Sequence, residues 1–354
     1  MKSYAAFEDL SIREVISEEK DLAPHEVRLS ITHCGVCHSD IHLREGHYDL
    51  GSRGKLELAK TGITYPMVLG HEIVGTVSAV GSEVTGVQPG DSRMVYPWLG
   101  CGKCATCLAG DENLCAYNTS IGLVRPGGYA EAITVPHEKY LLGHTGIDPR
   151  WAATLSCSGL TAYSAARKVL PLDPQALVVV IGVGGVGGMA VNILSALGHR
   201  NITAVDLNPE NLKHAQAAGA SNTLLLPGNG QRAEQQGELR GKARAVIDFV
   251  NNGTTAELGF DLLAKGGTQI MVGLFGGELV VPTAIMATKA LNLRGSYVGS
   301  LGELKELVEL AATGKIKPLR LSAGELSAPG VSAALQDLSD GKVTGRLVLE
   351  PVGA

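Results

Sequence analysis

The stretch LVVVIGVGGVGGMAVNILSAL, residues 177–197, decides the fold of the central part of the chain. It begins with a continuous apolar run, which predicts a strand buried on both faces. Gly182, Gly184 and Gly187 then form the pattern G-x-G-x-x-G ahead of a predicted helix. The apolar run from Ala176 to Val191 is shorter and richer in glycine than a membrane span requires, so we interpret the stretch as a strand, a turn and a helix.

Each glycine of this pattern has a physical task in a nucleotide-binding turn. The first permits the tight turn, the second lets a pyrophosphate approach the backbone, and the third lets helix and strand pack closely. Gly185 and Val186 complete the turn, and the helix N-terminus offers free N–H groups to phosphates. The alternative is a glycine-rich turn without a ligand. However, Asp206 ends the next predicted strand, 19 residues after Gly187. This acid can bind ribose hydroxyls and would repel a 2′-phosphate, which predicts NAD rather than NADP.

The segments after this turn continue the alternation of strands and helices. Strands are predicted over residues 177–181, 202–205, 223–226, 245–249 and 268–272, and helices over 187–197 and 209–218. This alternation predicts a doubly wound parallel sheet with both faces covered. A polar segment, residues 227–242, is predicted as a surface loop or a frayed helix.

The flanking parts of the chain have a different pattern. Short apolar runs separated by Gly, Pro and Asp predict an irregular, mostly β domain, with strands over residues 27–31, 72–80, 92–95 and 131–135. Near the C-terminus we predict a helix around Leu304 to Ala311, a second helix over 331–338 and a closing strand over 346–349. The predicted fold class is therefore α/β with an additional β-rich domain.

Length and composition exclude several classes of protein. The 354 residues suggest two domains, and a net charge of -5 offers no basic surface for nucleic acid. The N-terminal residues include acids where a signal peptide needs an apolar stretch, so we expect a cytoplasmic protein without a membrane partner. In that reducing compartment, the seven cysteines are expected to be thiols or metal ligands.

Four cysteines lie close together in the pattern C-x2-C-x2-C-x7-C: Cys101, Cys104, Cys107 and Cys115. Four thiolates can surround one tetrahedral Zn²⁺ and leave no open position, so a structural zinc site is predicted. An iron–sulfur cluster is the alternative, but the Cys-Pro pair of a ferredoxin run is absent.

A second group combines Cys37, His71 and Cys157, which are far apart in the sequence. Two thiolates and one imidazole can hold a zinc ion with a free fourth position, which is the pattern of a catalytic site. The spacing alone is weak evidence, since Cys157 could be a buried packing residue. The run C-x-x-C-H at 34–38 could mark haem attachment, but only in an exported protein.

Together these segments resemble the zinc-dependent alcohol dehydrogenases of the medium-chain dehydrogenase/reductase superfamily, over nearly the whole chain. The matching segments are Gly35–Asp40, Gly70–Glu72, the cluster from Cys101 to Cys115, Cys157–Ala162, Gly182–Gly187 with Asp206, and Gly295–Gly299. The resemblance implies a GroES-like catalytic domain over 1–157 with a zinc lobe at 96–117, a Rossmann domain over 158–295, and a return to the catalytic domain over 296–354. It also implies two zinc ions per subunit.

The resemblance also assigns roles to individual residues. It makes Cys37, His71 and Cys157 the catalytic zinc ligands, with Asp40 orienting His71 and Glu72 behind the metal. Ser39 and His42 fall on proton-relay positions, and loss of His42 is expected to slow turnover without abolishing it. The implied NAD contacts are His38, Thr161, Val272, Leu274, Ser296, Val298 and Arg346.

The implied reaction is NAD-dependent oxidation of an alcohol to an aldehyde or ketone (EC 1.1.1.-, and 1.1.1.1 in particular). Primary, medium-sized or aromatic alcohols are the first expectation, secondary alcohols the next, and Tyr48, Tyr96, Trp98 and Val298 are candidates for the pocket wall. The alternatives are a zinc polyol dehydrogenase, disfavoured by Cys157, a zinc-free quinone reductase, and an NAD-binding protein without turnover.

Three further expectations concern the rest of the chain. A homodimer or homotetramer is implied, with a contact near 291–298. The segment 48–62 is expected to be an insertion relative to shorter family members, beside the pocket entrance. Cys34 has no ligand role and is expected to be a packing residue.

Overall fold

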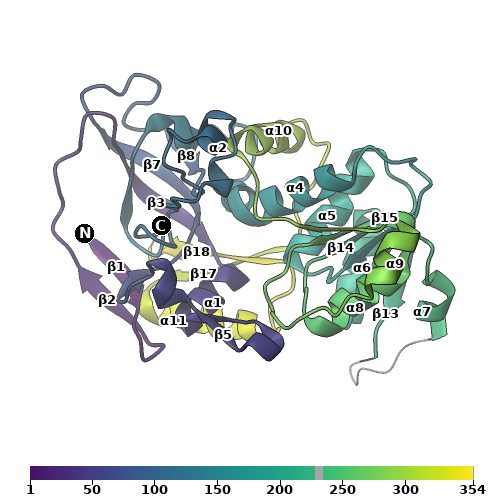
Figure 1. Cartoon of the computed structure of the whole chain (residues 1–354). Coiled ribbons are helices and arrows are strands. Elements are labelled where there is room, and N and C mark those ends of the chain that lie inside the picture. The colour runs from purple at the N-terminus through teal and green to yellow at the C-terminus, as the bar shows by residue number, and fades with distance from the viewer. Residues whose placement is uncertain (228–233, 354) are drawn as a thin grey trace. The chain divides into compact units, whose positions relative to one another are not determined.

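The computed structural model describes residues 1–227 and 234–353, which form two compact units (Figure 1). Unit 1 comprises Met1–His47, Glu57–Leu160 and Gly299–Ala354, and unit 2 comprises Tyr48–Leu56 and Thr161–Val298. Each unit has its own sheet system, so the two are described separately.

Unit 2 contains a six-stranded parallel sheet in the order β13-β12-β11-β14-β15-β16. Its strands are β11 (Val178–Ile181), β12 (Ile202–Asp206), β13 (Asn222–Leu225), β14 (Ala243–Asp248), β15 (Leu263–Met271) and β16 (Asn292–Gly295). Its helices are α4 (Leu160–Val169), which begins one residue before the unit, α5 (Gly185–Ala196), α6 (Pro209–Ala218), α7 (Glu234–Leu239), α8 (Gly253–Leu262) and α9 (Thr283–Lys289). The strand order reverses between β11 and β14, the position where doubly wound sheets bind nucleotides.

This sheet confirms the predicted Rossmann fold class. All four residues of β11 are buried, as its apolar run predicts for a central parallel strand. The strand β15 begins five residues earlier than the predicted 268, with a register irregularity against β14 between Ala243 and Ala245. Part of the predicted loop or frayed helix is α7, and residues 228–233 lie outside the described residues.

Gly182 and Gly187 are required by the backbone between β11 and α5. Gly182 has φ +77°, in the left-handed region that disfavours side chains. A Cβ on Gly187 would lie 1.9 Å from the carbonyl oxygen of Gly182. The third glycine therefore lets the helix begin directly against the turn.

Unit 1 is built on mostly antiparallel sheets, with β17 and β18 as a parallel pair, and helices lie around them. The larger sheet has the order β10-β8-β7-β3-β18-β17, with β9 also pairing with β3, and a smaller sheet has the order β2-β1-β6. The strands are β1 (Lys2–Ala6), β2 (Ile12–Ile16), β3 (Val27–Gly35), β6 (Met67–Val68), β7 (Glu72–Val80), β8 (Ser92–Val95), β9 (Ala132–Val135), β10 (Leu141–Leu142), β17 (Leu321–Leu326) and β18 (Arg346–Pro351). The predicted strands over 72–80 and 92–95 are confirmed with the same bounds.

The helices of unit 1 are mostly short. They are α1 (His38–Glu45), η2 (Leu58–Thr61), α2 (Ala105–Leu108), η3 (Glu112–Leu114), η4 (Glu138–Tyr140), α3 (Pro149–Thr154), the π-helical turn η5 (Leu155–Gly159), α10 (Leu301–Ala312) and α11 (Ala328–Ser339). The C-terminal strand β18 pairs with β3, where Leu349 lies opposite Cys34. The end of the chain thus completes the sheet that its beginning starts.

The segment 48–56 clusters with unit 2, although both of its flanks belong to unit 1. It contains η1 (Gly51–Arg53) and most of a hairpin formed by β4 (His47–Asp49) and β5 (Lys55–Glu57). Its contacts in unit 2 include a hydrogen bond of 2.6 Å from the Ser52 hydroxyl to Glu278 and one of 3.3 Å from the Gly277 N–H to the Asp49 carbonyl. Most of the predicted insertion is therefore attached to the nucleotide-binding sheet unit.

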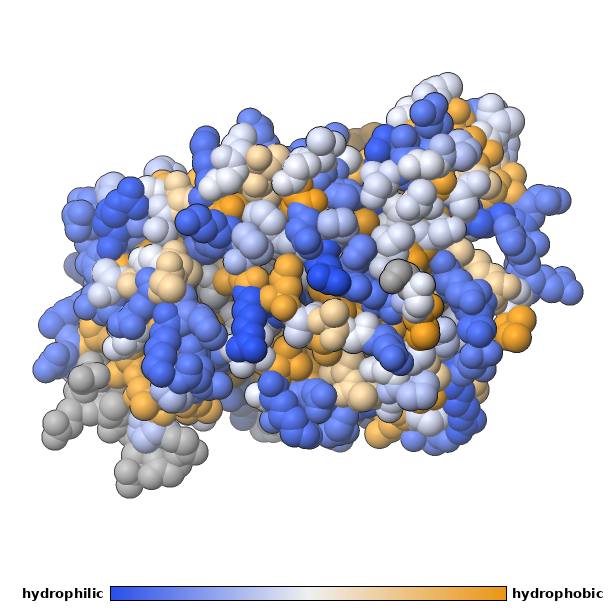
Figure 2. Space-filling model, turned by 180° about the vertical axis from the view of Figure 1, so that it is seen from behind, coloured by the Kyte–Doolittle hydropathy of each residue, from blue (hydrophilic) through white to orange (hydrophobic). Residues whose placement is uncertain are grey.

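The hydropathy of the surface can be followed on one face of the molecule (Figure 2). Hydrophilic residues cover much of the face in Figure 2, and hydrophobic residues lie between them as separate patches. Scattered apolar side chains of this kind are normal for such a surface. In the described part of the chain, the helices are too short or too polar to cross a bilayer.

Candidate functional site

Three separate elements of unit 1 bring together Cys37, His71 and Cys157. Cys37 precedes α1, His71 precedes β7, and Cys157 lies in η5. One ligand atom from each side chain lies within 4.8 Å of the others, and all three residues are buried.

The local backbone explains how each side chain reaches this point. Cys37 is the N-cap of α1, and its N–H donates to the Asp40 carboxylate at 3.0 Å. Gly70 has φ +88°, and a Cβ there would lie 2.7 Å from the Tyr129 ring, so the turn before His71 requires glycine. Cys157 lies in a π-helical turn, a distortion that is frequent at functional sites.

The distances between these donors fit a tetrahedral zinc ion. The sulfurs of Cys37 and Cys157 lie 4.0 Å apart, and Nε2 of His71 lies 3.2 Å from the Cys157 sulfur. With Zn–S bonds of about 2.3 Å, two sulfurs of a tetrahedron lie about 3.8 Å apart. The hydrogen bond with Cys157 holds the pKa of Cys37 well below its ordinary value although burial acts to raise it, which favours the thiolate that metals bind. The donor set therefore suits zinc and supplies three of four ligands.

Asp40 orients the imidazole of His71. Its Oδ1 lies 3.2 Å from Nδ1 of His71, and both side chains are fully buried. A proton on Nδ1 then leaves the Nε2 lone pair facing the two sulfurs. The contact expected between Asp40 and His71 is thus present in the structure, and its role at a metal ion stays a prediction.

Glu72 and Arg346 form a buried ion pair beside the same ligands. Nη2 of Arg346 donates to Oε2 of Glu72 at 2.5 Å, and the backbone N–H of Ser158 donates to Oε1 at 3.0 Å. The Arg346 residue is only 5% exposed. The structure therefore gives this arginine a buried partner in unit 1, and the contact with pyrophosphate that the resemblance implied stays a prediction.

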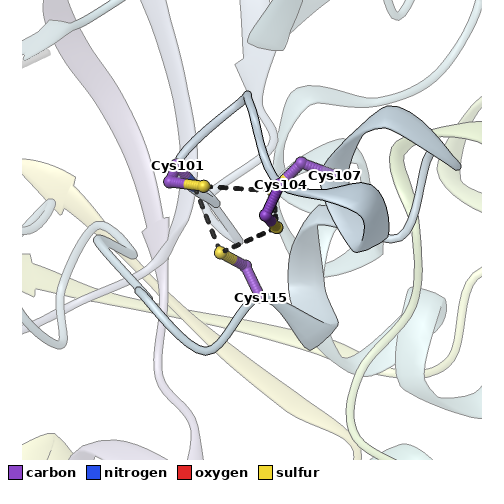
Figure 3. A group of neighbouring side chains, drawn as sticks. All are labelled: Cys101, Cys104, Cys107 and Cys115. Atoms are coloured by element: carbon purple, nitrogen blue, oxygen red, sulfur yellow. Dashed lines mark hydrogen bonds between the residues drawn. The ribbon is translucent and has the colours of Figure 1, made fainter.

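The four cysteines of the other cluster also meet at one point, with their sulfurs facing one another (Figure 3). The sulfur of Cys104 lies 3.5 Å from that of Cys107 and 3.8 Å from that of Cys115, and Cys101 and Cys107 are 3.9 Å apart. Backbone hydrogen bonds from Lys103 and Cys104 lower the pKa of Cys101 to about 6. The spacing suits one ion with four protein ligands and no free position.

Helix α1 carries the remaining residues that were predicted near the metal. His38, Ser39 and His42 are half-buried on this short helix. Burial lowers the pKa of His42, and Glu45 partly opposes that effect. A lowered pKa favours the neutral imidazole, which is able to accept a proton.

In unit 2, Asp206 lies at the end of β12, next to the glycine turn. Its carboxylate accepts hydrogen bonds of 2.8 Å from the Val183 and Asn208 N–H groups. The side-chain amide of Asn211 adds a contact of 3.3 Å. Gly184 is the N-cap of α5, and Gly185 and Val186 open this helix. The glycine turn, the helix N-terminus and the acid are thus adjacent, as the sequence pattern predicts.

The other predicted nucleotide contacts in unit 2 lie on or after its helices and strands. Thr161 is on α4, and Val272 and Leu274 follow the end of β15. Ser296 is buried, and its hydroxyl accepts a hydrogen bond of 3.0 Å from Lys168. Val298 has φ +41°, a strained value for a β-branched residue.

Several residues with contacts at these sites were missed by the sequence analysis. The Tyr129 hydroxyl donates to Asp40 at 3.0 Å, and Asn211 and Lys168 contact the predicted nucleotide residues. None of these belongs to a spacing pattern that could have singled it out. Trp98, predicted as a pocket wall, has its ring centroid 5.4 Å from that of His71.

Comparisons with known proteins agree with this arrangement. The family model of the alcohol dehydrogenase GroES-like domain matches residues 23–144, and that of the zinc-binding dehydrogenase matches 185–313. An NAD-dependent alcohol dehydrogenase of Sulfurisphaera tokodaii is 38% identical over 92% of both chains.

Solved structures give the same result. An alcohol dehydrogenase of Aeropyrum pernix has a TM-score of 0.87 at 30% identity, covering 99% of this chain and 100% of that one. An acetophenone reductase of Geotrichum candidum in complex with NAD has a TM-score of 0.84 at 28% identity, covering 99% and 96%. The chain therefore belongs to the zinc-dependent alcohol dehydrogenase family of the medium-chain dehydrogenase/reductase superfamily.

Proposed function

We propose that this NAD-dependent zinc alcohol dehydrogenase oxidises its substrate at the site formed by Cys37, His71 and Cys157. The observation that carries the proposal is the convergence of two buried sulfurs and one imidazole nitrogen, three donors in all. The four-cysteine cluster offers a complete tetrahedron, whereas this site leaves a fourth position for substrate. Cys101, Cys104, Cys107 and Cys115 then hold the structural ion.

The chain supplies orientation and proton transfer around that position. Zinc, when bound, contributes Lewis acidity that lowers the pKa of an alcohol hydroxyl, and NAD contributes the hydride acceptor. Asp40 holds the tautomer of His71 that exposes Nε2. Glu72, paired with Arg346, keeps a buried negative charge next to the ligands.

Two residues of α1 are proposed to carry the proton away. Ser39 lies two residues after Cys37, and His42 lies three residues after Ser39, so they share one face of the helix. The Ser39 hydroxyl accepts the substrate proton and at the same time gives up its own proton, which passes on to His42. Burial favours the neutral form of His42, so its imidazole can take up that proton and release it to solvent.

The nucleotide site in unit 2 is proposed to favour NAD over NADP. Asp206 directs its carboxylate to the glycine turn and can accept bonds from the ribose hydroxyls. Val272, Leu274, Ser296 and Val298, with Thr161, are the proposed contacts of the nicotinamide half, and His38 and Arg346 are proposed contacts of the phosphates.

We further propose primary, medium-sized or aromatic alcohols as substrates, corresponding to EC 1.1.1.1. Trp98 is buried beside His71 and supplies an aromatic wall close to the ligands. Such a wall favours flat or apolar substrates. Secondary alcohols remain the alternative within the same activity.

The proposed setting of the enzyme is the cytoplasm, where its thiols stay reduced. The proposed division is a catalytic domain over 1–157 and 296–354 with a nucleotide domain over 158–295. A homodimer or homotetramer is proposed, because β16 is the last strand of its sheet among the described residues and could pair with a second copy along its outer edge.

A substrate panel with metal analysis tests this function. The purified enzyme should hold about two zinc ions per subunit. It should reduce NAD with primary, aromatic and secondary alcohols, and lose this activity after chelation. Absence of turnover on the whole panel by the zinc-loaded protein, with NAD still bound, would show an NAD-binding protein instead.

A further inference from the structure

The Asp40 carboxylate receives four hydrogen-bond donors, two on each oxygen. Oδ1 accepts from the Gly70 N–H at 3.1 Å and from Nδ1 of His71 at 3.2 Å. Oδ2 accepts from the Cys37 N–H at 3.0 Å and from the Tyr129 hydroxyl at 3.0 Å. Asp40 therefore joins the backbone of one proposed ligand to the side chain of another.

Among these donors, Tyr129 is distinct because it comes from a separate segment of the chain. The other three belong to the proposed ligands or to the residue before one of them. The segment of Tyr129 is fixed against the turn before His71, since the Gly128 N–H donates to the Gly70 carbonyl at 2.7 Å and the Tyr129 N–H donates to the Leu69 carbonyl at 2.9 Å. The phenol thus reaches Asp40 from a backbone that also holds the histidine turn.

Burial makes the phenol contact matter. Asp40 and Tyr129 are both fully buried, so water cannot replace a lost donor. Without the hydroxyl, Oδ2 keeps only the Cys37 N–H, and one lone pair of a buried carboxylate loses its partner. The carboxylate is then less restrained in rotation, and so is the imidazole that it orients.

We propose that Tyr129 is a positioning residue of the catalytic metal centre, which fixes the Asp40 carboxylate and through it the His71 imidazole. This inference rests on the proposed function, because it requires zinc at Cys37, His71 and Cys157. The phenol touches neither metal nor substrate in this role. It acts by restricting the angle at which Nε2 meets the ion, and so slows the loss of the metal.

The test compares Tyr129→Phe with the matched variant Tyr140→Phe. Tyr140 is also a buried tyrosine of unit 1, and its hydroxyl donates to the Glu112 carboxylate at 2.6 Å, near the four-cysteine cluster. Each zinc-loaded protein is mixed with excess chromophoric chelator, and zinc release and remaining activity are followed in the same samples. Mutation of a residue that hydrogen-bonds to a metal ligand changes metal affinity about 10- to 100-fold. Tyr129 is one contact further from the metal. For Tyr129→Phe we therefore expect the zinc ion whose loss abolishes activity to be released about 5- to 10-fold faster. In Tyr140→Phe this release should keep the wild-type rate.

A spectroscopic readout separates positioning from general destabilisation. Cobalt can replace zinc and gives visible absorption bands. The bands of the catalytic site, which is the site whose metal content parallels activity, should shift in Tyr129→Phe. They should not shift in Tyr140→Phe. A wild-type release rate and an unchanged cobalt spectrum in Tyr129→Phe would overturn the proposal. A Tyr129→Phe protein that does not fold would also overturn it, because the residue would then have a structural role. If the activity of the wild-type protein does not fall as zinc is released, the proposed catalytic metal site is wrong. That outcome is distinguishable from a failure of the role of Tyr129 alone.

Discussion

At the scale of single residues, the two cysteine sites should respond differently to one lost sulfur. Cys37→Ser removes one of three donors, so we expect zinc to fall from about two to about one ion per subunit, with turnover lost and the melting temperature little changed. Cys107→Ser should lose the other ion and lower the melting temperature, because a four-cysteine ion contributes to folding. Metal analysis with thermal unfolding measures both, and equal effects of the two variants would contradict the division of roles.

The choice of cofactor should depend on the charge of Asp206. Asp206→Asn removes the repulsion of a 2′-phosphate, so the ratio of kcat/KM for NAD to that for NADP should fall about 10- to 100-fold, at about 1.4 kcal/mol per factor of ten. Glu210→Gln is the control, because Glu210 is an exposed carboxylate that pairs with Lys213. An equal change of the ratio in both variants would mean that the overall negative charge of the surface, and not a contact of Asp206, sets the preference for NAD.

The four-cysteine cluster could be predicted from its spacing, whereas Cys37, His71 and Cys157 were grouped through the family resemblance, because they lie far apart in the sequence. Partners that lie far along the chain could not be predicted. Tyr129 contacts Asp40 across 89 positions, and Arg346 contacts Glu72 across 274. No local pattern in the sequence records such contacts.

At the scale of elements, the segment 48–56 should be held in place by glycine at 276. Gly276 has φ +86°, and a Cβ there would lie 2.6 Å from the Asp49 carbonyl oxygen. Gly276→Ala should therefore loosen the segment, and trypsin cleavage after Arg53 and Lys55 should become about tenfold faster, as a packing clash of about 1–3 kcal/mol allows. Cleavage is measured by mass spectrometry of the released peptides.

Gly62→Ala is the matched control for this effect. Gly62 has a similar φ of +93°, but a Cβ there would meet nothing within 4 Å. It carries the backbone strain without the clash, so cleavage in the segment should stay near the wild-type rate. Equal acceleration in both variants would show that φ, and not contact with Asp49, is responsible.

The elements that the sequence predicted are those with a continuous apolar run or clear periodicity. The strand β11 and the helix α6 are examples, and α6 has the predicted bounds. The strand β17, LSAGEL, was not predicted, because it is a half-exposed edge strand with glycine in its middle. The helix α3 was also missed, since its buried run around Trp151 shows no polar face from which a period could be measured.

At the scale of the whole molecule, each unit combines segments that are far apart in the sequence. The return of the C-terminus to β3 was predicted through the family resemblance, since the pairing of Leu349 with Cys34 joins the two ends of the chain and leaves no local pattern. Attachment of 48–56 to unit 2 was not predicted, because hydrogen bonds such as that of Ser52 with Glu278 join positions 226 apart. Composition and periodicity describe neighbours along the chain, and these contacts join distant segments.

Stability against pH is a property of the whole molecule that one buried acid should influence. Asp248 ends β14 and is fully buried. Its Oδ1 accepts hydrogen bonds from the N–H groups of Val250 and Asn251 at 3.0 and 2.8 Å, while Oδ2 has no partner among the described residues. Burial raises the pKa of Asp248 from 3.8 to about 6, against these backbone hydrogen bonds.

A raised pKa of a carboxyl group means that the folded state binds its proton more tightly than the unfolded state. Between pH 4 and 6 the unfolded chain has already lost this proton, so the free energy of unfolding falls as pH rises, by about 3 kcal/mol in total at about 1.4 kcal/mol per pKa unit. Asp248→Asn keeps the Oδ1 acceptor and removes the charge. The stability of wild type relative to Asp248→Asn should therefore be greater at pH 4 than at pH 7, as measured by unfolding of both proteins at each pH.

Glu350→Gln supplies a control of opposite sign. A hydrogen bond from Arg150 lowers the pKa of Glu350, so its contribution to stability is present above the ordinary value of 4.5 and is lost as pH falls through the lowered pKa. Below pH 5, wild type should lose its advantage over Glu350→Gln while it gains on Asp248→Asn. Loss of zinc at low pH acts on all three proteins alike and cancels in these differences. Parallel pH profiles for wild type and Asp248→Asn would mean that the carboxyl group titrates in the folded protein as it does in water.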